Sequence, residues 1–230
     1  MPSDTETAFA VWLTGLPASG KSTIARALAA ELAGKGVRAA VLESDAVRRE
    51  ISPQPKYDDS ERDAFYATLA YLARVLVLHG VPVIVDATAN RRAYRDRARE
   101  AIPRFLEVHV RCPLPVCQAR DPKGIYRRGA AGTANNVPGI SAPYEPPLTP
   151  EVVVDGERGD PVVSARRIVS ALEKKGYLPR GPGDGVRLEN RRPDPPPIQF
   201  RRERPRDGRL SRSGQPRDPD GERGVAVRGH

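Results

Sequence analysis

Short continuous apolar runs alternate with longer segments of helical composition along the first 178 residues. The runs at residues 9–13, 39–42, 82–86, 105–110 and 152–155 are typical of strands buried on both faces of a parallel sheet. Helices are predicted at residues 23–36, 60–79, 93–102, 114–120 and 162–175. This order predicts an α/β fold, a three-layer doubly wound parallel sheet with right-handed crossovers, in which ligands collect at the carboxyl ends of the strands.

Two stretches of the chain break this alternation. Residues 121–150 lack periodicity but hold many Gly, Pro, Arg and Asn, and so long a loop inside a compact domain is usually a functional lid. From residue 179 onward Pro, Gly, Arg and Asp dominate, and no apolar run is long enough to offset the entropy of ordering the chain. We therefore predict a domain at residues 1–178, with its lid at about 121–150, and a disordered tail at residues 179–230.

The formal net charge of +9 is shared between this domain and the tail. Residues 180–230 contain 13 Arg and 8 acidic residues, so the tail carries +5 and the rest of the chain +4. A modest surplus suits an enzyme that handles anionic phosphate compounds. Positive and negative charges are interleaved in the tail, so a nucleic-acid partner is not expected.

The cysteine and histidine content argues against a zinc site. Cys112 and Cys117 are the only cysteines, and the three histidines are scattered without metal-ligand spacing. No apolar stretch reaches the roughly 18 residues of a membrane span, and no signal peptide precedes the first predicted strand. We expect a cytoplasmic protein with reduced thiols and no membrane contact. A homodimer is one oligomeric state that the sequence leaves open.

The segment between the first predicted strand and helix fits the phosphate-binding pattern G-x-x-x-x-G-K-[ST]. Its glycines let backbone N–H groups turn onto phosphate oxygens, and the positive end of the following helix supports their charge. Lys21 is predicted to reach the β- and γ-phosphates of ATP, and the Ser22 hydroxyl to coordinate Mg²⁺. The predicted ATP-binding residues of this loop are Gly15, Leu16, Pro17, Ala18, Ser19, Gly20, Lys21, Ser22 and Thr23. The loop predicts an ATP-dependent kinase that acts on a small molecule.

Two aspartates follow predicted buried strands. A kinase of this fold needs a carboxylate that orients or deprotonates the acceptor hydroxyl and helps to order the metal. Asp45 is a candidate for that catalytic role and for a metal ligand, with a helix N-cap as the alternative. Asp86 is a candidate magnesium ligand of Walker B type, with a purely structural cap as the alternative.

Cationic side chains are dense near the loops that follow the predicted strands. They can neutralise charge on the transferred group or hold an anionic acceptor. We expect Arg95, Arg97 and Arg99, on the predicted helix 93–102, to face solvent instead. The candidate cations are Arg48, Arg62, Arg92, Arg120, Lys123, Arg127 and Arg128.

Several segments resemble the adenylylsulfate kinases, which phosphorylate the ribose 3′-hydroxyl of adenylylsulfate. The phosphate loop is similar to that of the family, and LESDAVR at residues 42–48 is similar to its L-D-G-D-N-V-R. The most specific likeness lies in and before the lid, where PLPVCQARDPKGIY at residues 113–126 and GISAPYE at residues 139–145 follow the family pattern. The resemblance covers about residues 12–175.

The resemblance implies roles for individual residues. Asp45 would be the catalytic aspartate near the metal, and Arg120 would lie beside the base of ATP. Lys123 would be the lid lysine. The implied acceptor-binding residues are Arg48, Tyr57, Arg62, Lys123 and, in the lid, Ile140, to which we add Arg92 as a cation beside the third predicted strand.

Departures from the family pattern gather on the acceptor side. They are Phe65 and Ala67 in place of an asparagine and an arginine, Ala89 and Asn90 within the family's I-S-P segment, and Val137 in place of a lid phenylalanine. Asp86 replaces a small residue. Two alternatives therefore stay open. One is a kinase of another hydroxyl-bearing metabolite or of polynucleotide ends, because the VDATAN segment at residues 85–90 resembles a segment of such kinases. The other is an ATP-binding regulatory protein with weakened catalysis.

Overall fold

The computed structural model describes residues 8–52, 54–55 and 57–179. All of them belong to the first of two units into which the chain divides, Met1–Glu189. The predicted disordered tail, from residue 180, lies outside the described residues.

Five parallel strands form one sheet in this part of the chain, in the order β2-β3-β1-β4-β5. The strands are β1 (Ala10–Thr14), β2 (Ala40–Glu43), β3 (Val83–Asp86), β4 (Phe105–Arg111) and β5 (Val152–Asp155). Asp86 pairs in register with Leu13 on one side and with Glu43 on the other. The strands β1, β2 and β3 therefore end side by side, and the loops that follow them meet at one edge of the sheet.

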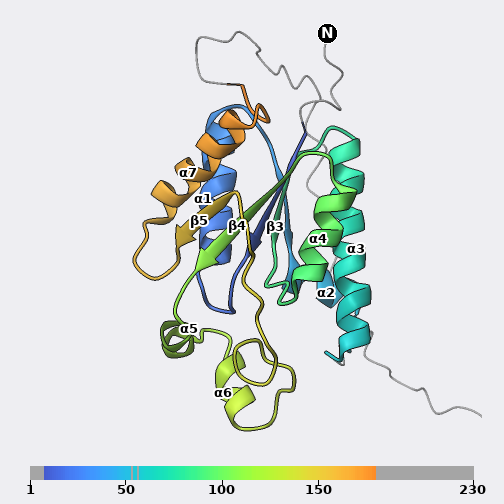
Figure 1. Cartoon of the computed structure of the whole chain (residues 1–230), viewed down its shortest axis with the longest axis vertical. Coiled ribbons are helices and arrows are strands. Elements are labelled where there is room, and N and C mark those ends of the chain that lie inside the picture. The colour runs from blue at the N-terminus through green and yellow to red at the C-terminus, as the bar shows by residue number, and fades with distance from the viewer. Residues whose placement is uncertain (1–7, 53, 56, 180–230) are drawn as a thin grey trace, which may run out of the picture. The chain divides into compact units, whose positions relative to one another are not determined.

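Helices cover both faces of the sheet, as Figure 1 shows. Helices α1 and α7 pack on one face, and α3 and α4 pack on the other. The short helices α5 and α6 lie beyond the carboxyl ends of the strands (Figure 1). The helices are α1 (Lys21–Gly34), α2 (Ser44–Ile51), α3 (Asp59–Leu78), α4 (Arg92–Ala101), α5 (Leu114–Arg120), α6 (Ile125–Ala130) and α7 (Pro161–Lys174).

Alternate residues of β1 serve two separate cores. Val11 and Leu13 join a cluster with α1 and α7, whereas Ala10 and Trp12 join one with α3 and α4. Because both faces of the strand are buried, it reads as a continuous apolar run instead of an alternating pattern. The three-layer fold predicted from the sequence is confirmed.

Predicted and observed elements agree to within one or two residues, with two omissions. The sequence did not predict α2 or α6. In α2 only Arg48 is buried, and in α6 only Tyr126 is buried. These helices have eight and six residues, and a pattern over so few residues is a weak signal for a helix.

The expectation that Arg95 faces solvent is wrong. Arg95 is 1% exposed, and its Nε lies 2.7 Å from Oε1 of the buried Glu107. Arg99 reaches the same carboxylate at 3.1 Å and stays partly exposed, and Arg97 pairs with Asp63 at the surface. A buried charge requires such a partner, because desolvation alone is too costly.

None of the helices in the described ranges is long and apolar enough to cross a membrane.

Candidate active site

The phosphate loop joins β1 to α1 in a conformation that only certain residues accept. Gly20, just before α1, has φ of 101°, a left-handed value that favours glycine. A Cβ on Gly15 would lie 2.5 Å from the carbonyl oxygen of Val110. Ala18 also has a positive φ, 61°, and such strain is concentrated at functional sites. The glycines of the motif are thus required by backbone geometry.

Lys21 is held within this loop by main-chain oxygens. Its Nζ donates to the carbonyls of Gly15, at 3.1 Å, and Leu16, at 2.8 Å. Burial lowers the pKa of Lys21, and the nearby carboxylates of Asp86 and Asp45 act in the opposite direction. A buried ammonium at the start of a helix is well placed to meet an anionic phosphate.

Asp45 and Asp86 lie at the same edge of the sheet but in different environments. Asp86 is buried at the end of β3, and burial raises its pKa, against the effect of Lys21 and the Ser22 hydroxyl. Asp45 lies in the first turn of α2, half exposed, and its Oδ2 is 2.6 Å from Nζ of Lys123. The N-cap residue of α2 is Glu43, and that of α4, the helix after β3, is Arg91. Neither aspartate is therefore a helix N-cap.

The residues predicted to hold Mg²⁺ fit the chemistry of that ion. Magnesium usually binds through one or two carboxylates together with substrate phosphates and water. A hydroxyl and two aspartates, Ser22, Asp45 and Asp86, are oxygen donors of this kind. No group of three or more metal-ligating His, Cys, Asp or Glu side chains gathers within the described ranges, so the nucleotide would have to supply part of the coordination.

Two of the three predicted acceptor arginines, Arg48 and Arg62, are buried but have different partners. Arg48 pairs with Glu61, and its guanidinium carbon lies 3.7 Å from the centre of the Phe65 ring and 5.1 Å from that of Tyr57. Glu61 was not among the predicted site residues, although it directly precedes Arg62.

Arg62 is held by three neutral acceptors. Its Nε donates to the Tyr57 carbonyl at 3.2 Å, its Nη1 to Oδ1 of Asn90 at 3.3 Å, and its Nη2 to the Asn136 carbonyl. These bonds orient the guanidinium without neutralising its charge. A buried, oriented cation of this kind can bind an anionic group.

The loop at residues 88–90 forms a rigid support for Asn90. Ala89 has φ of 42°; its N–H donates to the Tyr66 hydroxyl at 3.0 Å, and its carbonyl accepts from Arg95. The Thr88 carbonyl accepts from Thr14 at 2.7 Å. This support was not predicted, because the hydroxyl groups of Thr14 and Tyr66 come from β1 and α3, 74 and 23 positions away along the chain.

Arg120, predicted to lie beside the base of ATP, is bound to the loop after β5. Its two terminal nitrogens donate to the carbonyls of Gly156, at 2.6 Å, and Glu157, at 2.7 Å. The lid contacts the phosphate loop nearby, where the Tyr126 hydroxyl donates to the Pro17 carbonyl at 3.1 Å. Because a Cβ on Gly156 would lie 2.2 Å from the Ser19 carbonyl oxygen, Arg120 and the phosphate loop border the same region.

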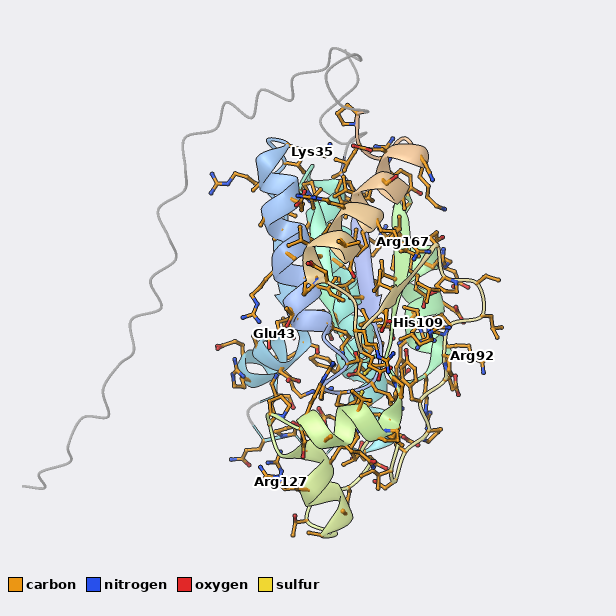
Figure 2. All side chains as sticks on the ribbon, turned by 90° about the vertical axis from the view of Figure 1, so that its left-hand side faces the viewer. Lys35, Glu43, Arg92, His109, Arg127 and Arg167 are labelled. Carbon is orange, nitrogen blue, oxygen red and sulfur yellow. The ribbon has the colours of Figure 1, made fainter. Side chains whose placement is uncertain are left out.

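Two predicted acceptor residues, Arg92 and Ile140, make none of the contacts described for Arg48 and Arg62. Arg92 pairs with Glu145 on the segment that returns from the lid, with its Nε 3.6 Å from the carboxylate. Ile140 is 40% exposed on the lid and packs toward Gly129. Figure 2 shows Arg92 and the lid residue Arg127 on different parts of the molecule, with Glu43 above the lid.

The arrangement combines the parts that phosphoryl transfer requires. A loop of main-chain N–H groups with a buried lysine faces a nearby aspartate, and two buried arginines lie beyond it at the same edge of the sheet. Such groups position a triphosphate, an attacking hydroxyl and an anionic acceptor.

Comparisons with known proteins support this interpretation. The adenylylsulphate kinase family model matches residues 7–155. An adenylyl-sulfate kinase of Gloeothece citriformis is 39% identical over 168 residues, which are 73% of this chain and 96% of that protein. A probable bifunctional SAT/APS kinase of Sorangium cellulosum is 40% identical over 75% of this chain, but the match spans only 30% of that longer protein.

A solved structure shows the same architecture. The adenylylsulfate (APS) kinase of Mycobacterium tuberculosis, in complex with AMPPNP and APS, matches with a TM-score of 0.69 and 31% identity, covering 73% of this chain and 98% of that one. The family model covers well over half of the chain, and the phosphate loop, Asp45 and the lid all lie within the matched range. This chain belongs to the adenylylsulphate kinase family.

Proposed function

We propose that this protein transfers the γ-phosphoryl group of ATP to the 3′-hydroxyl of adenylylsulfate, with Mg²⁺ as its metal ion. The observation that carries the proposal is the placement of Lys21, Asp45 and Arg62 at one edge of the sheet, within the matched family range. The curated relatives named adenylyl-sulfate kinase support the choice of acceptor.

The residues at this edge have distinct roles in the proposed reaction. Main-chain N–H groups of the phosphate loop and Lys21 hold the β- and γ-phosphates and offset the charge that develops during transfer. Asp45 accepts a hydrogen bond from the acceptor hydroxyl and takes its proton. Ser22, Asp45 and Asp86 would hold Mg²⁺, whose positive charge would offset part of the charge on the phosphates.

The lid supplies a second cation to this reaction. Lys123 Nζ lies 2.6 Å from Asp45 and 3.5 Å from Glu43. It thus holds the aspartate that faces the hydroxyl, and closing the lid brings the ammonium to the reaction centre. Burial acts to lower the pKa of Lys123, but Asp45 and Glu43 together outweigh it and raise the pKa, so the ammonium stays charged at neutral pH.

On the acceptor side Arg62 is the main anion site in the proposal. Its charge is oriented by neutral carbonyl oxygens, so the phosphosulfate group of adenylylsulfate can provide the counter-charge. Arg48 already has a carboxylate partner in Glu61. We therefore assign Arg48 a secondary role in acceptor binding.

The test is a comparison of two charge-removing substitutions on α2. Purified protein is incubated with ATP, Mg²⁺ and adenylylsulfate, and formation of ADP and 3′-phosphoadenylylsulfate is followed by chromatography. Asp45→Asn should lower the turnover rate at least about hundredfold, the usual contribution of a general base. Glu50→Gln, on the exposed face of the same helix, should have no effect. Absence of product with the unchanged protein would refute the proposal.

A kinase acting on another hydroxyl compound is the second candidate. Phe65 stacks on Arg48, and Asn90 bonds Arg62, so the acceptor side is built around residues that depart from the family pattern. ATP consumption with a panel of hydroxyl-bearing metabolites and polynucleotide ends would distinguish the candidates. Higher turnover with another acceptor than with adenylylsulfate would favour the second.

A further inference from the structure

The tip of the lid, residues 135–137, contacts the acceptor side of the site through one asparagine. Nδ2 of Asn136 donates to the Tyr57 carbonyl at 2.8 Å, and the Asn136 carbonyl accepts from Arg62. One residue therefore joins the lid to Arg62 both directly and through Tyr57, which itself accepts from Nε of Arg62 at 3.2 Å.

The backbone on both sides of this contact is strained. Asn136 has φ of 55° and Tyr57 has φ of 56°. Asparagine tolerates the left-handed region, but a tyrosine there is uncommon. Strained residues persist where surrounding contacts over-determine them. Tyr57 has such contacts, because its N–H donates to Glu61 and its carbonyl accepts from Arg62 and Asn136.

A second connection reaches Arg62 from the other end of the lid. Asn90 accepts from Arg62 through Oδ1 and donates from Nδ2 to the Pro143 carbonyl at 3.0 Å. The main-chain carbonyl of Asn90 accepts from the N–H of Glu145 at 2.8 Å. The tip and the returning segment of the lid are thus both bonded to groups that orient Arg62.

Two further polar contacts of the lid have different targets. Tyr126 bonds the phosphate loop through Pro17, and Lys123 bonds Asp45. These contacts belong to the ATP side and to the reaction centre. Asn136 is the lid-tip residue whose side chain and backbone both reach the acceptor side.

We propose that Asn136 is a positioning residue that locks the lid tip onto the acceptor site and makes lid closure depend on the orientation of Arg62. The identity of the acceptor rests on the proposed function; the lock does not. Since the lock and the acceptor use the same guanidinium in the same orientation, each should favour the other, and thermodynamic linkage requires the effect to be reciprocal.

The experiment compares Asn136→Gly with Asn135→Gly. Glycine accepts the left-handed backbone at residue 136 and keeps the carbonyl that accepts from Arg62, so only the side-chain bond to Tyr57 is lost. Asn135 is the exposed neighbour in the lid and controls for adding a glycine. Hydrogen exchange of lid peptides spanning residues 124–137 is measured with AMPPNP bound, and KM for adenylylsulfate and for ATP are measured separately.

Asn136→Gly should raise the exchange rate of the lid about five- to tenfold relative to Asn135→Gly, as expected for one lost hydrogen bond. It should raise KM for adenylylsulfate by a similar factor and leave KM for ATP within about twofold. Asn136→Asp should not restore the lock, because a carboxylate cannot donate to the Tyr57 carbonyl.

Equal lid exchange in Asn136→Gly and Asn135→Gly would overturn the lock, whatever the turnover. A rise in KM for both substrates alike would also overturn it, since that is the result of a generally loosened fold. If the unchanged protein does not phosphorylate adenylylsulfate, the proposed function fails, and the exchange comparison still decides on the lock.

Discussion

Replacing Gly156 by alanine tests how the sheet supports the phosphate loop. A Cβ at this position would lie 2.2 Å from the carbonyl oxygen of Ser19, within the loop, whereas ordinary contacts begin at 3.4 Å. One of the two backbones must therefore move by about 1.2 Å. Retreat of residue 156 is opposed by Val110, whose Cγ1 would be 2.9 Å away, and by the Arg111 carbonyl at 3.3 Å.

Such a shift is large relative to the tolerance of phosphate binding. Hydrogen bonds from N–H groups are best at about 2.9 Å and are weak beyond about 3.5 Å, so moving Ser19 and its neighbours by about 1 Å removes several of them. The affinity for ATP should fall at least about tenfold, or about 1.4 kcal/mol. The overpacked contact should also lower the free energy of unfolding by about 1–3 kcal/mol.

The assay is calorimetric titration with ATP and Mg²⁺, combined with urea unfolding. Gly34→Ala is the matched control, because nothing lies within 4 Å of the added Cβ at the end of α1. Alanine should be neutral or stabilise that helix by up to about 1 kcal/mol. ATP binding by Gly156→Ala within twofold of the unchanged protein would show that close packing of the loop after β5 does not support the phosphate loop.

Three further predictions concern stability. Arg95→Ala leaves Glu107 buried with fewer partners and should lower the free energy of unfolding in urea by about 3–5 kcal/mol. Arg97→Ala removes a surface pair and should lower it by under about 1 kcal/mol. Equal losses in the two variants would contradict the assigned burial. Burial, with Arg95 and Arg111 nearby, lowers the pKa of His109 to about 4. Protonation therefore disfavours the native state, and stability should fall as pH drops from about 6.5 toward 4. His109→Gln should lose less melting temperature between pH 7 and pH 5 than the unchanged protein, and an identical loss would count against this cause. Ala18→Gly relieves the strain of a left-handed backbone, about 1–2 kcal/mol, but glycine also has a greater entropy in the unfolded chain. The free energy of unfolding should therefore rise by up to about 1 kcal/mol. A clear decrease would show that φ at residue 18 is not strained.

Local sequence determined the five strands, five of the helices and the phosphate site. Continuous apolar runs predicted β1 and β3, because a strand that is buried on both faces is recognisable from a few consecutive apolar residues. The loop Gly15–Ser22 was predicted because the groups that its chemistry requires are neighbours along the sequence. Arg95 could also have been predicted as buried, since it shares the stripe of α4 that includes Ala98 and continues to Ile102.

Tertiary structure decided the strand order and the partner of each charged side chain. Arg48 and Arg62 have the same residue type and similar burial, yet one pairs with Glu61 and the other bonds Asn90 and the lid tip at Asn136. These partners lie up to 74 positions away along the chain, and no local pattern encodes them. Folding places the ends of the strands and the lid side by side, and that proximity determines which arginine remains available to an anion.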